Sequence, residues 1–273
     1  MKKAILLVAF GVSSLQGQRA LKCFDARVRA RFPGISVRWA FTSILLRERL
    51  ASARLKSDSV RKALYKCCFE KFDRVVVQPL QTIAGEEYAD VCVAVDEVAS
   101  QMGIEGRVGC PLLTTEEDVR LAAKAVMRHL PQTRNEEEDV IFMGHGARHA
   151  AVSRYGDLDT MVRLLDSRVH VGAMNGAVAL EEILLRLSSS RVWLMPLLSV
   201  VGRHALMDMA GEQGDSWRSR IEATGRKCMP VLAGTVEHEG FAEIWLNHLA
   251  EAVAAPDVAA SARLTNGDSG SRR

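Results

Sequence analysis

Paired cysteine motifs are absent from this chain of 273 residues. Its six cysteines are scattered, and none belongs to a CxxC motif. This pattern argues against a disulfide scaffold and against a cysteine-based zinc site, and it favours reduced thiols in a cytoplasmic protein. The cysteines are Cys23, Cys67, Cys68, Cys92, Cys110 and Cys228.

Long apolar runs are also missing, since no stretch approaches the roughly 18 residues that a membrane helix needs. The first residues, MKKAILLVAFGVSS, resemble a signal peptide because two lysines precede an apolar run. The run is short and no A-x-A cleavage site follows it, so we expect a first β-strand instead. We therefore expect a cytoplasmic protein with no membrane partner.

Common nucleotide and nucleophile motifs do not occur. The chain contains no GxxxxGKS or GxxxxGKT, no GxSxG, and no GxGxxG after the first apolar run. These absences argue against a P-loop, a serine nucleophile elbow and a dinucleotide site. The formal net charge of +3 suits an anionic ligand but is too small to suggest nucleic acid.

Short apolar runs alternate with longer segments of helical periodicity. This alternation predicts an α/β fold with parallel sheets covered on both faces. The expected strands are 4–10, 36–42, 74–80, 107–113, 139–144, 168–174, 191–198 and 228–234, and the expected helices include 18–32, 59–72, 159–167 and 179–190.

The second half of the chain resembles the first, at a spacing of more than one hundred residues. In an alignment of the two halves, Pro79 matches Pro196, Gly85 matches Gly202, Glu87 matches His204, and Gly11 matches Gly146. This similarity predicts two similar doubly wound parallel-sheet lobes with a cleft between them. We place the lobes at 1–132 and 133–255, joined in the polar segment 130–139, and expect a disordered tail at 256–273.

Ligands of open parallel sheets bind beyond the carboxyl ends of the strands. The candidate site residues are therefore those that follow strands. They are Gly11 to Ser14, Thr42, Ser43, Gln81 to Glu87, His145 to His149, Asn175 and Gly202 to His204.

The histidine of VIFMGHGARH, His145, follows an apolar run and lies between two glycines. Glycines let another group approach the backbone closely, so we expect this imidazole to face a ligand. A histidine in the core would instead lie inside an element beside a partner. His149 follows four residues later, and its geometry after the glycines is not predictable. We interpret His129, His170, His238 and His248 as ordinary surface or helix residues.

His204 and Glu87 are two further candidates, and an ordinary structural role explains each of them equally well. If His204 begins a helix, Asp208 lies one turn later and can accept the proton of one ring nitrogen, the usual support of a metal-binding histidine. The same spacing fits a surface His–Asp pair. Glu87 matches His204 in the alignment of the two halves, and it also fits a helix N-terminal charge.

The segment GHGARH also permits a phosphohistidine hypothesis, in which a histidine after a strand is phosphorylated. Histidine phosphatases have an arginine before that histidine, on the first strand. Here Gly144 precedes His145 and the strand is the fifth. The missing arginine, which would hold phosphate, makes phosphoryl transfer the weakest hypothesis.

Several segments together resemble the anaerobic cobalt chelatases, lyases that insert cobalt into sirohydrochlorin for cobalamin biosynthesis. These class II chelatases are related to the ferrochelatases and use no ATP. The similarity runs through most of the chain, up to about residue 256, and implies two similar doubly wound lobes around a tetrapyrrole. The most specific segments are VIFMGHGARH and LMPLLSVVGRHALMDMAGEQGDSW.

The resemblance implies that His145 is the catalytic base and a metal ligand, and that His204 is a second metal ligand. A neutral imidazole can accept a pyrrole proton near neutral pH and holds Co²⁺ or Fe²⁺ only moderately. The resemblance further implies no organic cofactor and no ATP. The divalent metal, Co²⁺ with Fe²⁺ as the alternative for siroheme, is itself a substrate, and the resemblance leaves a homo-oligomer open.

The expected contacts with the tetrapyrrole are Gly11, Ser13, Gln81, Glu87 and Asn175. Two of these depart from the family pattern. Asn175 stands where the family has a metal-binding glutamate, and Gln81 stands where we expect histidine. A neutral amide cannot balance the metal's charge. The competing hypothesis is therefore a non-catalytic tetrapyrrole or metal carrier on the same scaffold.

Overall fold

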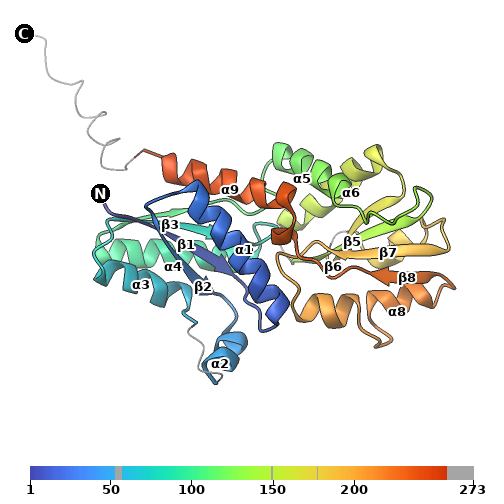
Figure 1. Ribbon diagram of the computed structural model, residues 1–273, viewed down its shortest axis with the longest axis horizontal. Helices are drawn as coiled ribbons and strands as arrows, with labels where there is room; N and C mark the ends of the chain where they lie inside the picture. The colour runs from blue at the N-terminus through green and yellow to red at the C-terminus, as the bar shows by residue number, and fades with distance from the viewer. Residues whose placement is uncertain (53–56, 149, 177, 257–273) are drawn as a thin grey trace, which may run out of the picture.

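The first half of the chain forms a four-stranded parallel sheet. The computed structural model describes residues 1–52, 57–148, 150–176 and 178–256. The strands are β1 (Lys3–Ala9), β2 (Ser36–Phe41), β3 (Arg74–Pro79) and β4 (Glu105–Val108), in the order β2-β1-β3-β4 (Figure 1). The expected strand at 107–113 begins two residues earlier and ends at Val108.

The second half repeats the same topology. Its strands are β5 (Asp139–Gly146), β6 (Val169–Asn175), β7 (Arg191–Pro196) and β8 (Lys227–Pro230), in the order β6-β5-β7-β8. All pairs in both sheets are parallel. The predicted α/β fold with two similar doubly wound lobes is therefore confirmed.

Helices cover the sheets. The α-helices are α1 (Leu15–Arg31), α2 (Ile44–Ser52), α3 (Val60–Phe69), α4 (Glu86–Met102), α5 (Glu116–Arg128), α6 (Ser153–Leu165), α7 (Leu180–Leu184), α8 (Trp217–Glu222) and α9 (Glu239–Ala254). Three short turns are helical as well: the 3₁₀ turns η1 (Ala150–Val152) and η3 (Thr235–Glu237), and the π-helical η2 (His204–Met209). The helix expected at 179–190 is shorter than predicted, because it ends at Leu184.

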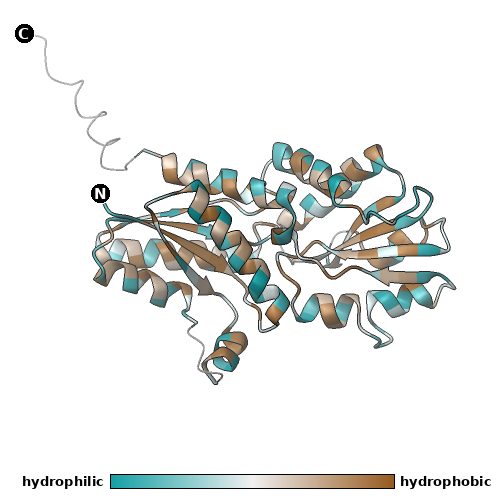
Figure 2. Cartoon of the chain, viewed as in Figure 1, coloured by the Kyte–Doolittle hydropathy of each residue, from teal (hydrophilic) through white to brown (hydrophobic). Residues whose placement is uncertain are grey.

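The apolar runs form central strands because both faces of each sheet are covered. Along β1, Ile5 and Leu7 belong to one hydrophobic core, together with Phe24 of α1. Leu6 and Val8, the alternate residues, belong to a second core on the other face. This alternation explains why six consecutive residues of β1 are buried, and Figure 2 shows the strands as brown arrows between the helices.

The last helix connects the two halves. Although α9 follows the second sheet in sequence, it packs on α5, α1 and β3 of the first half. Trp245 of α9 is fully buried and forms a T-shaped ring pair with Phe24, at 6.3 Å between ring centroids. His248, which we expected to be an ordinary surface or helix residue, is buried with its Nε2 2.9 Å from Asp118 Oδ1. The division at 130–139 stays a prediction, and the predicted tail lies outside the described residues beyond Pro256.

None of the helices within the described ranges is long and apolar enough to cross a membrane.

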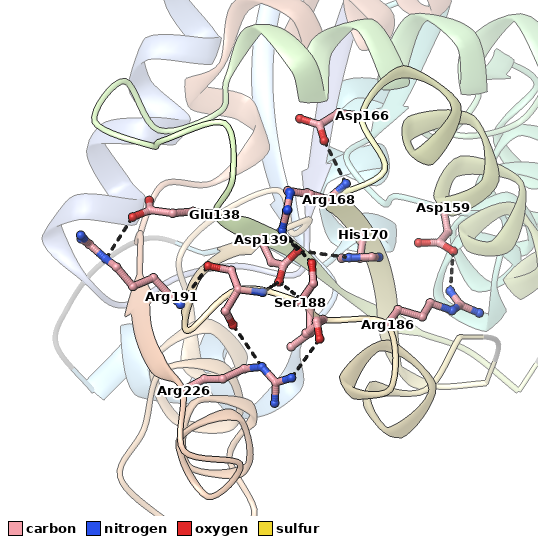
Figure 3. A network of polar contacts seen from close by, with 12 residues as sticks. Glu138, Asp139, Asp159, Asp166, Arg168, His170, Arg186, Ser188, Arg191 and Arg226 are labelled. Carbon is pink, nitrogen blue, oxygen red and sulfur yellow. Dashed lines mark hydrogen bonds and ion pairs between the residues drawn. The ribbon is translucent and has the colours of Figure 1, made fainter.

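A buried polar network closes the amino-terminal edge of the second sheet (Figure 3). Asp139 starts β5 and is 1% exposed. Its Oδ2 accepts the backbone N–H groups of Ser188 and Ser189 at 2.9 and 2.7 Å. His170 is also 1% exposed, which corrects its assignment as an ordinary surface or helix residue. Burial lowers the pKa of His170, so this imidazole is neutral beside Asp139 at neutral pH.

Replacing Asp139 with asparagine is expected to lower the free energy of unfolding by about 2 kcal/mol, because two hydrogen bonds to a buried carboxylate lose their charge. Chemical denaturation measures the effect. Asp157→Asn is the control, since the Asp157 side chain is half-exposed and its ion pair with Arg154 is at the surface. That control is expected to change stability by less than about 0.5 kcal/mol. Equal stabilities of the two variants would contradict the prediction.

Candidate functional site

A cavity of about 620 Å³ lies between the two halves, at the carboxyl ends of the strands. The loops after β1, β3, β5 and β7 line it. In both sheets these strands flank the point where the strand order reverses, which is where open α/β sheets bind ligands. Six of the residues that were expected to bind the metal or the tetrapyrrole line the cavity: Gly11, Ser13, Gln81, Glu87, His145 and His204.

His145 presents an exposed imidazole from the end of β5. The glycines around it also have a packing reason that the sequence did not predict. A Cβ on Gly144 would lie 2.2 Å from the Tyr155 ring, and a Cβ on Gly146 would lie 1.8 Å from the Asn175 carbonyl oxygen. The chain's own atoms fill both places, and the approach of a ligand to the backbone at these glycines stays a prediction. They let the chain pack tightly beneath the imidazole.

Tyr155 of α6 packs against this turn on the side of the core. The sequence did not indicate this role. Its ring is fully buried, and burial raises the pKa of its phenol to about 12. Hydrogen bonds with the Gly146 backbone and the Thr82 hydroxyl lower this pKa, but by less than burial raises it. Thr82 belongs to the first half of the chain and also donates to the Leu197 carbonyl at 3.3 Å. A tyrosine at a helical core position carries no sequence signal for such a role.

His204 lies across from His145. The two ring centroids are 4.7 Å apart, with the rings inclined by 64°. His204 begins the π-helical turn η2, and its Nδ1 lies 2.6 Å from Asp208 Oδ2, the contact that the spacing predicts. His145 Nδ1 lies 3.1 Å from the Gly146 carbonyl oxygen. When both Nδ1 atoms donate these hydrogen bonds, both Nε2 atoms carry a lone pair that can bind a metal ion.

Glu87 completes this group from the first turn of α4. Burial raises the pKa of its carboxyl, and three neighbours oppose that rise: the Gln81 amide and the charges of His145 and His204. The Gln81 amide otherwise has no partner of standard hydrogen-bond geometry within the described chain. Glu87 therefore lies at a helix N-terminus and is also coupled electrostatically to both histidines.

Asn175 lies apart from the cavity lining. It ends β6, is exposed, and its amide donates to the His145 carbonyl at 3.3 Å. Asp208 lies behind His204 and also does not line the cavity. Across the described ranges, no three His, Cys, Asp or Glu side chains converge as a metal site. His149, a further candidate, lies outside the described residues.

Comparisons with known proteins agree in sequence and in fold. Residues 3–254 match the model of the cobalt chelatase family CbiK. The sirohydrochlorin cobaltochelatase CbiKC of Nitratidesulfovibrio vulgaris is 52% identical over 260 residues, which cover 94% of this chain and 92% of that protein. The sirohydrochlorin cobaltochelatase of Salmonella typhimurium is 31% identical over 93% of this chain and 97% of that protein.

Solved structures of more distant sequence have the same fold. SirB from Bacillus subtilis with Fe³⁺ superposes with a TM-score of 0.63 at 17% identity, over 93% of this chain and 96% of that one. The sirohydrochlorin chelatase SirB from Bacillus subtilis subspecies spizizenii, in complex with cobalt, also gives 0.63, at 16% identity over 94% and 97% of the two chains. Together with the match over nearly the whole chain, the two-lobed fold and the cleft between the lobes, this similarity means that the chain belongs to the cobalt chelatase family.

Proposed function

We propose that this protein is a sirohydrochlorin cobaltochelatase that inserts Co²⁺ into sirohydrochlorin without ATP. The observation that carries the proposal is the pair of facing imidazoles, 4.7 Å apart, in an interlobe cavity large enough for part of a flat macrocycle. The 52% identity to a cobaltochelatase supports the same assignment. Fe²⁺ is the alternative metal, and the scattered thiols favour a cytoplasmic location.

Metal insertion requires the ring to exchange two pyrrole protons for one divalent ion. In this proposal, His145 and His204 hold the ion by their Nε2 atoms before it meets the ring nitrogens. As the ion moves to the macrocycle, His145 Nε2 becomes free and accepts one pyrrole proton. The Glu87 carboxylate, whose pKa burial raises, is the acceptor for the second proton.

The residues present suit a metal that must leave again. No cysteine is among the described residues that line the cavity, so none of them offers a thiolate that would bind the ion tightly. Among the described residues, no third His, Cys, Asp or Glu converges with the two imidazoles as a metal site. Two imidazoles bind a divalent ion moderately, which favours its release to the four ring nitrogens.

Anaerobic insertion kinetics test the proposal. Purified protein is mixed with sirohydrochlorin and Co²⁺ or Fe²⁺, and the visible spectrum is followed against a sample without protein. Acceleration over that control supports a chelatase, and the faster metal identifies its preferred substrate. Spectral changes on binding with no acceleration would instead identify a carrier, the hypothesis that Asn175 favours, and Asn175→Glu would then test whether a carboxylate restores insertion.

Asp208→Asn is expected to weaken metal binding by about tenfold, because the carboxylate orients the His204 ring and makes Nε2 a better ligand. Titration of the metal-free protein with Co²⁺ measures the affinity, and the KM for metal should rise with little change in kcat. Glu212→Gln is the matched control, since this carboxylate lies on the same segment and is 91% exposed. An Asp208→Asn affinity equal to that of the control would refute the supporting role.

A further inference from the structure

The side chains of two arginines in the cavity have no partner among the described residues. Arg49 and Arg203 are the only lysine or arginine side chains among the described residues that line it. Neither guanidinium group makes a hydrogen bond or ion pair with another described residue. Many other arginines of this chain are paired, as Arg134 is with Asp166 at 2.8 Å. Guanidinium groups left unpaired in a ligand cavity are available to bind an anion.

Helix α2 holds Arg49 at the cavity. Leu45 and Arg49 are four residues apart, so they share one face of the helix, and both line the cavity. Leu46 and Leu50 share another face, which is buried. Leu46 packs against the end of β1, where its Cδ2 occupies the space 2.1 Å from an ideal Cβ on Gly11. This contact anchors α2, which projects from the first lobe in Figure 1.

The second arginine comes from the other lobe. Arg203 immediately precedes η2, the turn that carries His204. Exposed apolar side chains from both lobes line the cavity with the two arginines: Leu45, which is 71% exposed, and Phe10 from the first lobe, and Leu206 and Met207 from the second. The lining thus combines apolar surface with one cation from each lobe. A flat apolar ring with anionic groups at its edges has the complementary chemistry.

We propose that Arg49 and Arg203 form a carboxylate clamp that selects tetrapyrroles with carboxylates around the whole ring over tetrapyrroles with carboxylates on one edge. The clamp rests on the proposed function and specifies how that site recognises its substrate. The apolar side chains contact the faces of the macrocycle, and each guanidinium binds a carboxylate at the rim. Glu86 also lines the cavity, and its carboxylate repels a substrate carboxylate placed beside it. The positions of the two arginines therefore determine where substrate carboxylates can bind.

Fluorescence titration tests the clamp without metal. The probes are sirohydrochlorin and uroporphyrin, with carboxylates around the ring, and mesoporphyrin, with carboxylates on one edge. Arg49→Ala and Arg203→Ala are each expected to weaken binding of the first two probes by about tenfold, and the preference over mesoporphyrin should shrink. Arg49→Lys should recover part of the affinity. The matched control is Arg47→Ala, because Arg47 belongs to the same helix, does not line the cavity and contacts the Ser43 carbonyl.

Insertion kinetics then separate the clamp from the activity. A clamp predicts a higher KM for sirohydrochlorin in Arg49→Ala at nearly constant kcat. Equal affinities of Arg49→Ala and Arg47→Ala for uroporphyrin would overturn the clamp, even if the wild-type protein inserts cobalt. A wild-type protein that binds uroporphyrin through Arg49 but accelerates no insertion would keep the clamp and overturn the proposed chelatase.

Discussion

Replacing His145 with alanine is expected to lower kcat for cobalt insertion by about 10²- to 10⁴-fold, the usual effect of losing a positioned acid–base group. The imidazole is exposed in the cavity and faces His204, so its loss removes both a metal ligand and a proton acceptor. Anaerobic stopped-flow spectroscopy of the wild-type protein and the variant measures the change in rate.

The fold should survive this substitution because the His145 side chain is exposed. We therefore expect the thermal midpoint to stay within about 2 °C. Added imidazole should restore part of the rate by entering the space that the side chain leaves. Retention of the rate within threefold would remove His145 from the mechanism. A covalent phosphohistidine with no dependence on His204 would instead support phosphoryl transfer.

Much of the fold was predictable because the buried strands are local apolar runs. All eight expected strands form, and the two that end earliest relative to the expectation, 107–113 and 228–234, contain prolines that cannot donate to a sheet ladder. The internal similarity was visible because equivalent turns need equivalent residues. Gly11 and Gly146, matched from the sequence, both have positive φ, at 114° and 77°. Pro79 and Pro196, also matched, both end their strands.

The candidate site was predictable where it depends on spacing along the chain. The contact between His204 and Asp208 follows from their separation by four residues, although the turn that forms it is a π-helix. The position of Glu87 was predictable because residues that follow a strand of an open parallel sheet lie at the edge where ligands bind. Residues that act through tertiary contacts carried no such signal: Tyr155 and Arg49 lie on helices whose approach to the cavity depends on packing.

The burial of His170 shows the same limit. A histidine inside an apolar strand pattern gives no indication that a carboxylate from the neighbouring strand lies beside it. The register of β5 and β6, which pairs Ile141 with His170, brings Asp139 and His170 into one network. Register depends on how the whole lobe packs, so the sequence left His170 indistinguishable from a surface residue.

Replacing Gly146 with alanine is expected to damage both stability and activity. Its φ of 77° is unfavourable for an L-residue by about 1–2 kcal/mol. In addition, the new Cβ would lie 1.8 Å from the Asn175 carbonyl oxygen, a backbone atom that cannot rotate away. The end of β5 must then move from β6. We expect a loss of about 2–5 kcal/mol in the free energy of unfolding.

The same movement displaces the neighbouring His145 and should lower insertion by about 10²-fold, since a shift near 1 Å in a catalytic group has effects of that size. Two alanine controls separate the causes. Gly34 has a φ of 82° with open space around it, so Gly34→Ala tests the backbone strain alone. Gly202 lines the cavity with no atom within 4 Å of a Cβ, so Gly202→Ala tests an added methyl group at the site. Denaturation and insertion rates of all three variants decide the matter: if Gly146→Ala matches Gly34→Ala in both, the contact with Asn175 does not position His145.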